Sequence, residues 1–337
     1  MVEKVKDQQR GGSAYKHDAG QTRISIKHQV TIPSSPPPER RYARVMGPVC
    51  AVVVTYNRKE MLRRCLSALS EQRRAPDRIL VVDNASSDGT REMLAQEFAS
   101  TELLAMAVNE GGAGGFHEGM KRAHADGAEW LWLMDDDTIP EPDALAELLH
   151  ARERLDHESA PTLLASRAIW RDGTMHPMNM PIFERRRMER VIAAVQQGVM
   201  PIRGATFVSL LVHRGVVDRY ELPLKHFFLW ADDIEYTSRV VLGGDGAYFV
   251  PTSVVLHDTA AAEDFRTAKP DRFYYHVRNT LFMARAGDRP ARDRLLRLWI
   301  LVSTCVDYVL RNRSAASVAA IARALRDGLR RVPAQRS

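Results

Sequence analysis

Residues 130–142 read WLWLMDDDTIPEP, and this stretch decides the expected fold. Its apolar run, residues 130–134, leads directly into three consecutive aspartates, Asp135, Asp136 and Asp137. A short apolar run is typical of a buried parallel strand, and open α/β sheets bind ligands at the carboxyl ends of such strands. Three adjacent like charges are tolerated when solvent surrounds them or when a divalent cation lies among them. The apolar run would press these charges against a core, which favours the cation over a solvated loop.

The chain before this stretch alternates apolar runs with segments of helical periodicity. The apolar runs predict strands at 50–56, 78–84 and 103–108. The segments between them predict helices at 58–72, 90–98 and 116–126, the last preceded by a glycine-rich turn. Such alternation indicates a parallel sheet with right-handed crossovers. We therefore expect an α/β fold with a mostly parallel central sheet and flanking helices.

Polar residues close three of the expected strands. Thr55 and Asn57 end the first strand, Asp83 and Asn84 end the second, and the aspartate triplet ends the fourth. One polar strand end is only a turn signal. Three of them at one edge of a parallel sheet predict a ligand-binding crevice.

The glycine-rich segment, NEGGAGGF at 109–116, needs separate weighing. Gly112 and its neighbours could bring a helix N-terminus close to a bound phosphate. The segment is not a dinucleotide-binding fingerprint, which would follow the first strand, and no Gly-Lys-Ser/Thr follows as in a P-loop. Taken alone, the glycines favour a tight turn that needs positive φ.

The second half of the chain holds another acidic cluster. A strand is expected at 203–213, followed by HFFLWADDIEYTSRV at 226–240, where aromatic residues precede Asp232, Asp233 and a helix. Aspartate is a preferred helix N-cap, which explains one of the two aspartates well and both of them less well.

Two strands and a histidine follow this cluster. Residues 247–258 predict two short strands around Pro251, with His257 at the end of the second. A lone histidine is usually structural. A further helix is expected at 271–285.

Charge is unevenly distributed along the 337 residues. The formal net charge is +6, but residues 1–45 carry +5, residues 286–337 carry +7, and the middle of the chain carries −6. An acidic middle argues against a nucleic-acid enzyme, so no nucleic-acid partner is expected. It suits an acidic, metal-binding site flanked by basic ends that could touch an anionic surface.

The remaining composition favours a protein without membrane spans. The first twenty residues lack the apolar core of a signal peptide, and no apolar run is long enough to cross a bilayer. Cys50, Cys65 and Cys305 show neither metal-ligand nor redox spacing, and the first two are expected to be packing thiols in a reducing compartment.

Four motifs together resemble the family 2 glycosyltransferases of the GT-A fold. They are VVVTYNR at 52–58, ILVVDNASSDGT at 79–90, NEGGAGGF at 109–116 and WLMDDDTIPEPDAL at 132–145. A GGAGG turn is similar to that of bacterial galactofuranosyl- and rhamnosyltransferases. The resemblance implies transfer from a nucleotide sugar, with UDP-galactofuranose favoured and dTDP-rhamnose as the alternative, to a lipid-linked glycan acceptor of the cell envelope.

The resemblance also implies which residues form the donor half of the site. The nucleotide pocket would be lined by Thr55, Asn57, Arg58, Asp83, Asn84, Gly112 and Asp136. Mn²⁺ or Mg²⁺ would be held by Asp135, Asp137 and His257. Such a cation would neutralise the diphosphate leaving group. Glu110 is unusual beside a diphosphate and is expected to point away.

The acceptor half is implied in the same way. Asp233 would be the catalytic base of an inverting displacement, and Asp232 and Glu235 would bind acceptor hydroxyls. Trp230 would stack on a sugar face or belong to the core. An Arg-Asn pair at 278–279 is expected either to pack or to contact phosphate.

The domain organisation follows from these assignments. We expect a disordered or loosely attached arm at 1–45, a catalytic domain at 46–286 divided near residue 150 into donor and acceptor halves, and a basic amphipathic helical extension at 287–337. The segment 289–331 predicts an interfacial helix on an anionic leaflet or a helix packed on the core or on a second subunit. The enzyme would be cytoplasmic or peripheral on the inner face of the membrane.

Two other classes stay open on sequence alone. A sugar-1-phosphate nucleotidyltransferase would need a basic glycine-rich loop near the first strand, where only Arg58 is available. A non-catalytic binding scaffold would be expected to lack the acidic residues that are present here.

Overall fold

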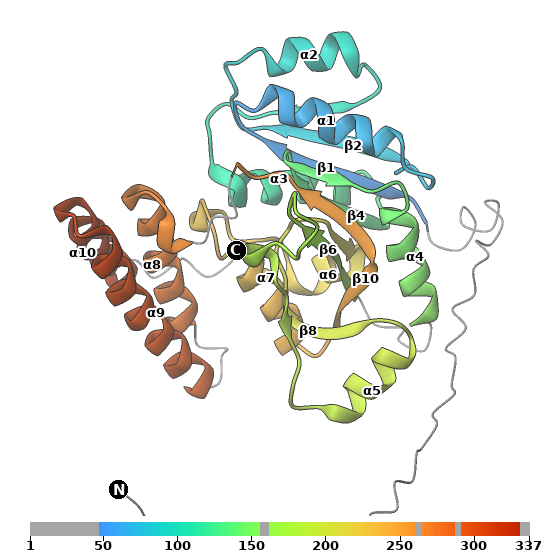
Figure 1. Ribbon diagram of the computed structural model, residues 1–337. Coiled ribbons are helices and arrows are strands. Elements are labelled where there is room, and N and C mark those ends of the chain that lie inside the picture. The colour runs from blue at the N-terminus through green and yellow to red at the C-terminus, as the bar shows by residue number, and fades with distance from the viewer. Residues whose placement is uncertain (1–46, 156–161, 261–264, 287–290, 331–337) are drawn as a thin grey trace, which may run out of the picture. The chain divides into compact units, whose positions relative to one another are not determined.

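The computed structural model describes residues 47–155, 162–260, 265–286 and 291–330, and only these are considered below (Figure 1). The expected N-terminal arm at 1–45 lies outside the described residues. No helix among the described residues has the length and apolar character needed to cross a bilayer.

The first four strands of the sheet form the parallel half that the sequence predicts. In spatial order they are β3 (Glu102–Ala105), β2 (Arg78–Asp83), β1 (Val49–Thr55) and β4 (Trp130–Asp135). Each neighbouring pair is parallel, and Thr55 of β1 lies opposite Asp83 of β2. The polar strand ends therefore lie at one edge of the sheet, as expected.

Beyond β4 the sheet becomes mixed. The order continues through β9 (Leu210–His213), β6 (Thr162–Ile169), β10 (Gly246–His257), β8 (Met200–Gly204) and β7 (Ile182–Phe183), while β5 (Thr138–Pro140) pairs with β10. Only β6 and β10 are parallel in this half. The α/β class is confirmed, and the parallel arrangement applies to the N-terminal half.

Helices cover both faces of the sheet, because strand residues alternate between two apolar cores. One core joins the strands to α1 (Lys59–Ser70), α2 (Thr90–Glu97) and α4 (Ala144–Arg154). The other joins them to α3 (Gly111–Ala125), α6 (Arg214–Tyr220) and α7 (Asp232–Leu242). A further helix, α5 (Met188–Gln196), precedes β8 (Figure 1). Cys50 and Cys65 are buried in these cores, as predicted.

Two strand predictions in the second half need correction. The single strand predicted at 203–213 is two strands, because residues 205–209 leave the extended conformation and Ser209 among them has a left-handed backbone (φ 57°). The two strands predicted around Pro251 are one strand, β10, with an irregularity in its pairing between Val250 and Val254. A bulge accommodates proline, which has no N–H to give to the ladder.

The glycine-rich segment is also different from the prediction. The helix begins at Gly111, so most of the glycines lie in its first turns instead of preceding it. Only Gly111 in this run needs positive φ (+73°). An ideal Cβ on Gly115 would lie 2.5 Å from Val54 Cγ1, and one on Gly119 would lie 2.5 Å from Val52 Cγ1. Glycine at these two positions lets α3 lie close against β1.

Three helices end the described chain. The extension expected at 289–331 is two helices, α9 (Ala291–Asn312) and α10 (Ala315–Arg330), and both pack beside α8 (Pro270–Arg285) (Figure 1). They share an apolar core that includes Phe273, Leu281, Leu301, Tyr308 and Ala324. Helix α8 therefore packs with the extension.

Replacement of Gly119 by alanine should destabilise the fold. The added methyl group would meet the stiff side chains of Val52 and Val82, at 2.5 and 2.8 Å, so we expect Gly119→Ala to lower the free energy of unfolding by about 1–3 kcal/mol. Gly112→Ala on the same helix is the control. It meets no atom within 4 Å and should change stability by no more than about 1 kcal/mol. Urea denaturation of both variants measures this, and equal stabilities would contradict the close approach of α3 to the sheet.

Candidate active site

A reversal of the chain after Asp137 brings distant residues together. Strand β5 follows Asp137 immediately and runs antiparallel to the end of β10, with Thr138 opposite His257. The backbone N–H of Asp258 also donates to the Asp137 carbonyl, at 2.9 Å. As a result, His257 Nε2 lies 3.2 Å from Asp137 Oδ1. Two of the three predicted metal ligands are therefore adjacent.

A neighbouring amide orients the His257 ring. His257 Nδ1 lies 2.7 Å from Asn179 Oδ1, and because an amide oxygen can only accept, Nδ1 carries the proton. Nε2 then faces Asp137. The His176 ring packs against His257 with centroids 4.7 Å apart. Neither Asn179 nor His176 was anticipated from sequence, since nothing in a local pattern indicates a contact over such a separation.

The Asp137–His257 pair fits a divalent cation. Asp137 Oδ1 is buried and has no hydrogen bond of good geometry among the described residues. Carboxylate oxygen and imidazole nitrogen are both ligands of Mn²⁺ in proteins, and a metal-binding histidine usually donates its other N–H to a carbonyl, as His257 does to Asn179. Within the described ranges, no three acidic, histidine or cysteine residues gather closely enough to hold an ion.

Arg58 supplies the positive charge at this position in the structure. Its Nη1 lies 2.5 Å from Asp137 Oδ2 and 3.3 Å from Asp136 Oδ1. The Thr55 hydroxyl donates to Asp136 Oδ2 at 2.8 Å. Burial raises the pKa of Asp136 to about 6 against the opposing charge of Arg58. Burial would also raise the pKa of Asp137, but the contacts with His257 and Arg58 outweigh it and lower that pKa to about 2.

Asp135 is the least satisfied member of the triplet. Its carboxylate is half-buried and has no hydrogen bond or ion pair within the part of the chain that the structure describes. Burial and the charges of Asp137 and Asp136 raise the pKa of Asp135 well above its usual value. The charge of Asp232 adds to this shift, so the two acidic clusters lie within electrostatic reach of each other.

The other residues predicted to line a nucleotide pocket have partners within the protein. Asp83 is fully buried and accepts from Arg91 Nε at 2.5 Å and from the Ser86 N–H at 2.9 Å. Asn57 Oδ1 accepts from the Ser87 N–H at 2.7 Å. A hydrogen bond from Asp83 to the nucleobase of the donor would require Arg91 to move away or to share the Asp83 carboxylate. The role of Asp83 in the nucleotide pocket stays a prediction.

The glycine-rich start of α3 lies next to this second strand end. Asn84 Nδ2 donates to the Gly111 carbonyl at 3.2 Å, while Asn84 Oδ1 is buried with no partner among the described residues. Space beside Gly112 is open. Glu110 lies 3.4 Å from Lys225 Nζ, so its carboxylate has a basic partner outside the aspartate triplet.

The second acidic cluster begins helix α7. Ala231 occupies the N-cap with a left-handed backbone, and Asp232 and Asp233 are the first two helical residues. The N-cap interpretation of these aspartates is therefore wrong. The Ile234 N–H donates to Asp233 Oδ1 at 2.6 Å. Trp230, immediately before the helix, is half-buried and also has positive φ.

Burial raises the pKa of both aspartates, and it raises that of Asp232 further. Burial and the charge of Asp233 raise the pKa of Asp232 to about 8. Burial raises the pKa of Asp233 to about 6, although backbone N–H groups oppose the shift. Glu235 differs, because both of its oxygens accept from Arg239, at 3.0 Å each. The spacing of four residues on one helix is the signal that could have predicted this pair.

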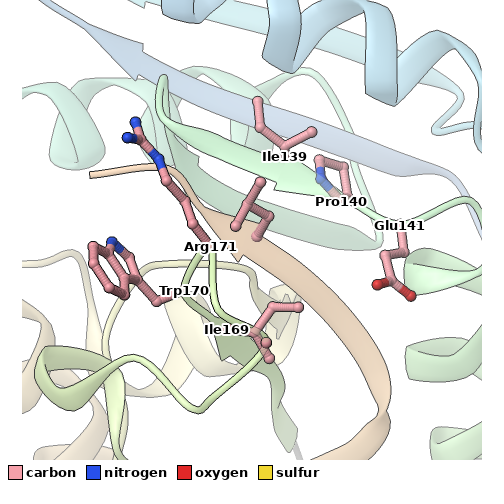
Figure 2. Close-up of a pocket in the computed structure, with 8 residues that line it drawn as sticks. Ile139, Pro140, Glu141, Ile169, Trp170 and Arg171 are labelled. Carbon is pink, nitrogen blue, oxygen red and sulfur yellow. The ribbon is translucent and has the colours of Figure 1, made fainter. Parts of the chain in front are cut away.

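A separate cavity of about 430 Å³ lies beside the site (Figure 2). Its lining residues are Ile139, Pro140, Glu141, Ile169, Trp170, Arg171, Gly173 and Leu256. Because neighbouring residues of a strand point to opposite faces, Leu256 and the cavity lie across the sheet from His257. The cavity is therefore distinct from the acidic site.

Comparison with known proteins identifies the family of this chain. The family model described as "Glycosyl transferase family 2" matches residues 50–209. Galactofuranosyltransferase GlfT1 of Mycobacterium tuberculosis is 31% identical over 215 residues, which cover 60% of this chain and 70% of that protein. An N-acetylglucosaminyl-diphospho-decaprenol L-rhamnosyltransferase of the same organism is 24% identical over 240 residues, covering 62% of this chain and 75% of that protein.

Solved structures support the fold. S. aureus TarS 1–349 in complex with UDP-GlcNAc has a TM-score of 0.57 at 16% identity and covers 85% of this chain and 82% of that chain. GalNAc-T7 with UDP, GalNAc and Mn²⁺ has a TM-score of 0.52 at 12% identity, covering 76% and 54%. The fold is that of the GT-A glycosyltransferases. The chain belongs to glycosyltransferase family 2 and is a glycosyltransferase.

Proposed function

We propose that this enzyme is an inverting, metal-dependent galactofuranosyltransferase that uses UDP-galactofuranose and a lipid-linked glycan acceptor of the cell envelope. The observation that carries the proposal is the contact between Asp137 and His257, beside Asp135, whose pKa the charge of Asp232 helps to raise. A leaving-group site and a base at one edge of a sheet are what sugar transfer requires. Family membership sets aside the nucleotidyltransferase and scaffold alternatives.

The donor half would consist of the strand ends of β1, β2 and β4. Asp137 and His257 would hold Mn²⁺ or Mg²⁺, and Asp135 would complete the ligand set by turning toward them. The cation, when bound, would neutralise the charge of the leaving diphosphate. The contact between Arg58 and Asp137 would then break, and the Arg58 guanidinium would contact the nucleotide instead. The rest of the pocket would be formed by Thr55, Asn57, Asp83, Asn84, Gly112 and Asp136.

The acceptor half would begin at α7. A pKa of about 6 lets Asp233 accept a proton near neutral pH, as a general base must. Asp232 would bind an acceptor hydroxyl, and Trp230 would offer its half-buried ring to a sugar face. We assign Glu235 to the support of α7 through Arg239, since both of its oxygens are occupied.

The reaction would be a single displacement. Asp233 removes the proton from an acceptor hydroxyl while that oxygen attacks the anomeric carbon from the face opposite the diphosphate. The bond to the diphosphate oxygen breaks as the new glycosidic bond forms, so the configuration inverts. The proton remains on Asp233 and the nucleoside diphosphate leaves.

The relatives support a galactofuranose donor over a rhamnose donor. The galactofuranosyltransferase is 31% identical and the rhamnosyltransferase 24% identical. The name of the latter specifies a diphospho-decaprenol acceptor, which supports a lipid-linked acceptor for this enzyme as well. dTDP-rhamnose remains the second candidate donor, because the rhamnosyltransferase is also a relative of this chain.

Incubation of the purified protein with single nucleotide sugars tests this proposal. We expect UDP release from UDP-galactofuranose with Mn²⁺ and a polyprenyl-linked glycan, and loss of release when EDTA removes the cation. Release of dTDP from dTDP-rhamnose alone would select the second donor. Equal release with and without EDTA would contradict the assignment of Asp135, Asp137 and His257.

The variant Asp233→Asn identifies the base in this assay. It should bind UDP and Mn²⁺ within about twofold of the wild type but lower kcat by about 10²–10⁴-fold, the usual contribution of a general base. Isothermal titration measures the binding of UDP with Mn²⁺, and initial rates measure kcat. Near-normal turnover would assign the proton transfer to another residue.

Asp232→Asn should make the enzyme more stable at alkaline pH. A carboxyl whose folded-state pKa is raised to about 8 holds its proton more tightly when folded, so it contributes a loss of folded stability as pH rises from about 4 to about 8. We expect the variant to exceed the wild type by at least about 1 kcal/mol at pH 8 and by less at pH 5. Urea denaturation at both pH values measures the difference, and a gain independent of pH would reject the raised pKa.

Helices α9 and α10 carry the features that support contact with a membrane. Many of the large apolar side chains that are exposed lie on them, including Leu295, Trp299, Val302, Val306 and Leu310. An apolar groove of about 310 Å³ opens between the two helices. Residues 291–330 hold eight arginines and three aspartates, a net charge of +5 that complements an anionic leaflet. We place the enzyme at the inner face of the membrane through this surface.

Point variants test membrane contact better than deletion, because α8 shares a core with α9 and α10. The double variant Trp299→Glu, Val302→Glu changes side chains that are 68% and 63% exposed. It should lose most co-sedimentation with vesicles that contain an anionic phospholipid. The control is Val195→Glu, an exposed apolar position on α5. Unchanged vesicle binding together with loss of a dimer in light scattering would assign this surface to a second copy.

A further inference from the structure

The loop at residues 226–231 has an unfavourable backbone conformation. Phe228, Trp230 and Ala231 have φ of 63°, 64° and 69°, a region that residues other than glycine seldom adopt. Such a backbone persists only when surrounding contacts hold it, and these residues often occur at functional sites. This loop leads directly into Asp232 and Asp233.

Asn279 of α8 donates to the loop along most of its length. Its side chain is fully buried, and Nδ2 lies 3.0 Å from the carbonyl oxygen of Phe227, 2.9 Å from that of Leu229 and 2.8 Å from that of Trp230. Its Oδ1 accepts from Arg278 Nε at 3.0 Å. One amide group therefore ties three carbonyls of the loop to α8.

Arg278 adds two donors from the same turn of α8. Its Nη2 lies 2.8 Å from the carbonyl oxygens of both His226 and Phe227. The guanidinium is itself held between aromatic rings, with its central carbon 4.9 Å from the Tyr275 centroid and 5.4 Å from the Phe282 centroid. These ring contacts hold the guanidinium in place independently of its hydrogen bonds to the loop.

Ring contacts and α3 complete the support. The Phe228 ring stacks on Tyr275 with centroids 5.0 Å apart. On the other side, the Ala113 N–H lies 3.3 Å from the Phe228 carbonyl, and an ideal Cβ on Gly111 would lie 2.0 Å from that oxygen. The loop is therefore held between α8 and the glycine-rich start of α3, next to the proposed donor pocket.

We infer that Arg278 and Asn279 are positioning residues, which hold the 226–231 loop so that α7 begins with the proposed base at Asp233 and Trp230 faces the acceptor. This role accounts for the pair better than phosphate contact, since Arg278 Nη2 and Asn279 Nδ2 donate to backbone carbonyls. The inference rests on the proposed function of Asp233. It assigns to α8 a part in acceptor geometry and none in donor binding.

A matched arginine on the same helix separates positioning from packing. Arg285 Nη1 donates to the carbonyl oxygens of Gly328 and Leu329, at 2.6 and 2.7 Å. It therefore joins α8 to α10 in the way that Arg278 joins α8 to the loop. Arg278→Met and Arg285→Met each remove such donors and keep an apolar chain of similar length. Asn279→Asp keeps the size of the side chain and removes its N–H donors.

The experiment combines hydrogen exchange with kinetics. In Arg278→Met and Asn279→Asp, amide exchange in the peptide 226–235 should accelerate at least tenfold. Turnover should fall about 10–100-fold and KM for the acceptor should rise, because a small misplacement of a reacting group is enough for such losses. Binding of UDP with Mn²⁺ should stay within about twofold. Arg285→Met should leave all of these values near those of the wild type.

The outcomes that would overturn the inference are distinct from failure of the proposed function. Unchanged exchange of peptide 226–235 in both variants, or a loss of UDP binding as large as the loss of turnover, would reject a positioning role. Equal effects of Arg285→Met would show that general stability of α8 is responsible. If the wild type releases no nucleoside diphosphate from any nucleotide sugar, the proposed function fails, while the exchange measurement still reports whether α8 holds the loop.

Discussion

The pairing of β5 with the end of β10 is the constraint on which the site depends. This pairing spans three residues of each strand, from Thr138 opposite His257 to Pro140 opposite Val255. Because side chains alternate along a strand, a shift of one residue would place Leu256 in the position of His257. The bulge in β10 between Val250 and Val254 lies before this pairing, in the part of the strand that pairs with β6. The geometry of the acidic site is therefore determined by the backbone pairing next to it.

The second constraint is the concentration of negative charge at one edge of the sheet. Asp135, Asp136, Asp232 and Asp233 all have raised pKa values, and burial is the first cause in each. Arg58 is the cation that pairs with the triplet. A fold selected for stability alone would replace or pair such groups, because an uncompensated buried carboxylate is unfavourable. Their presence at one edge is consistent with the proposed roles in binding a cation and accepting a proton.

Sequence patterns predicted the parallel half well and the second half less well, for a physical reason. Strands β1, β2 and β4 are buried on both faces and give continuous apolar runs, and their ends follow from the polar residues after them. The break at Ser209 depends on a left-handed backbone, and the continuity of β10 through Pro251 depends on a bulge. Neither changes the local apolar pattern. His257 was assigned through family resemblance, whereas Asn179 and Arg91 could not be found, because their contacts come from tertiary structure.

Helix α8 shows why composition and packing divide this chain differently. The charge distribution changes near residue 286, and that change suggested a boundary between catalytic domain and extension. Packing places no boundary there: Phe273 and Leu281 of α8 share a core with α9 and α10, while Arg278 and Asn279 bond to the loop before α7. One helix thus contacts both the extension and the loop before α7. Net charge describes the surface of a segment, whereas a shared apolar core identifies the elements against which it packs. The extension and the acceptor half therefore share α8 as a structural support, although none of the described side chains of the extension belongs to the proposed chemistry.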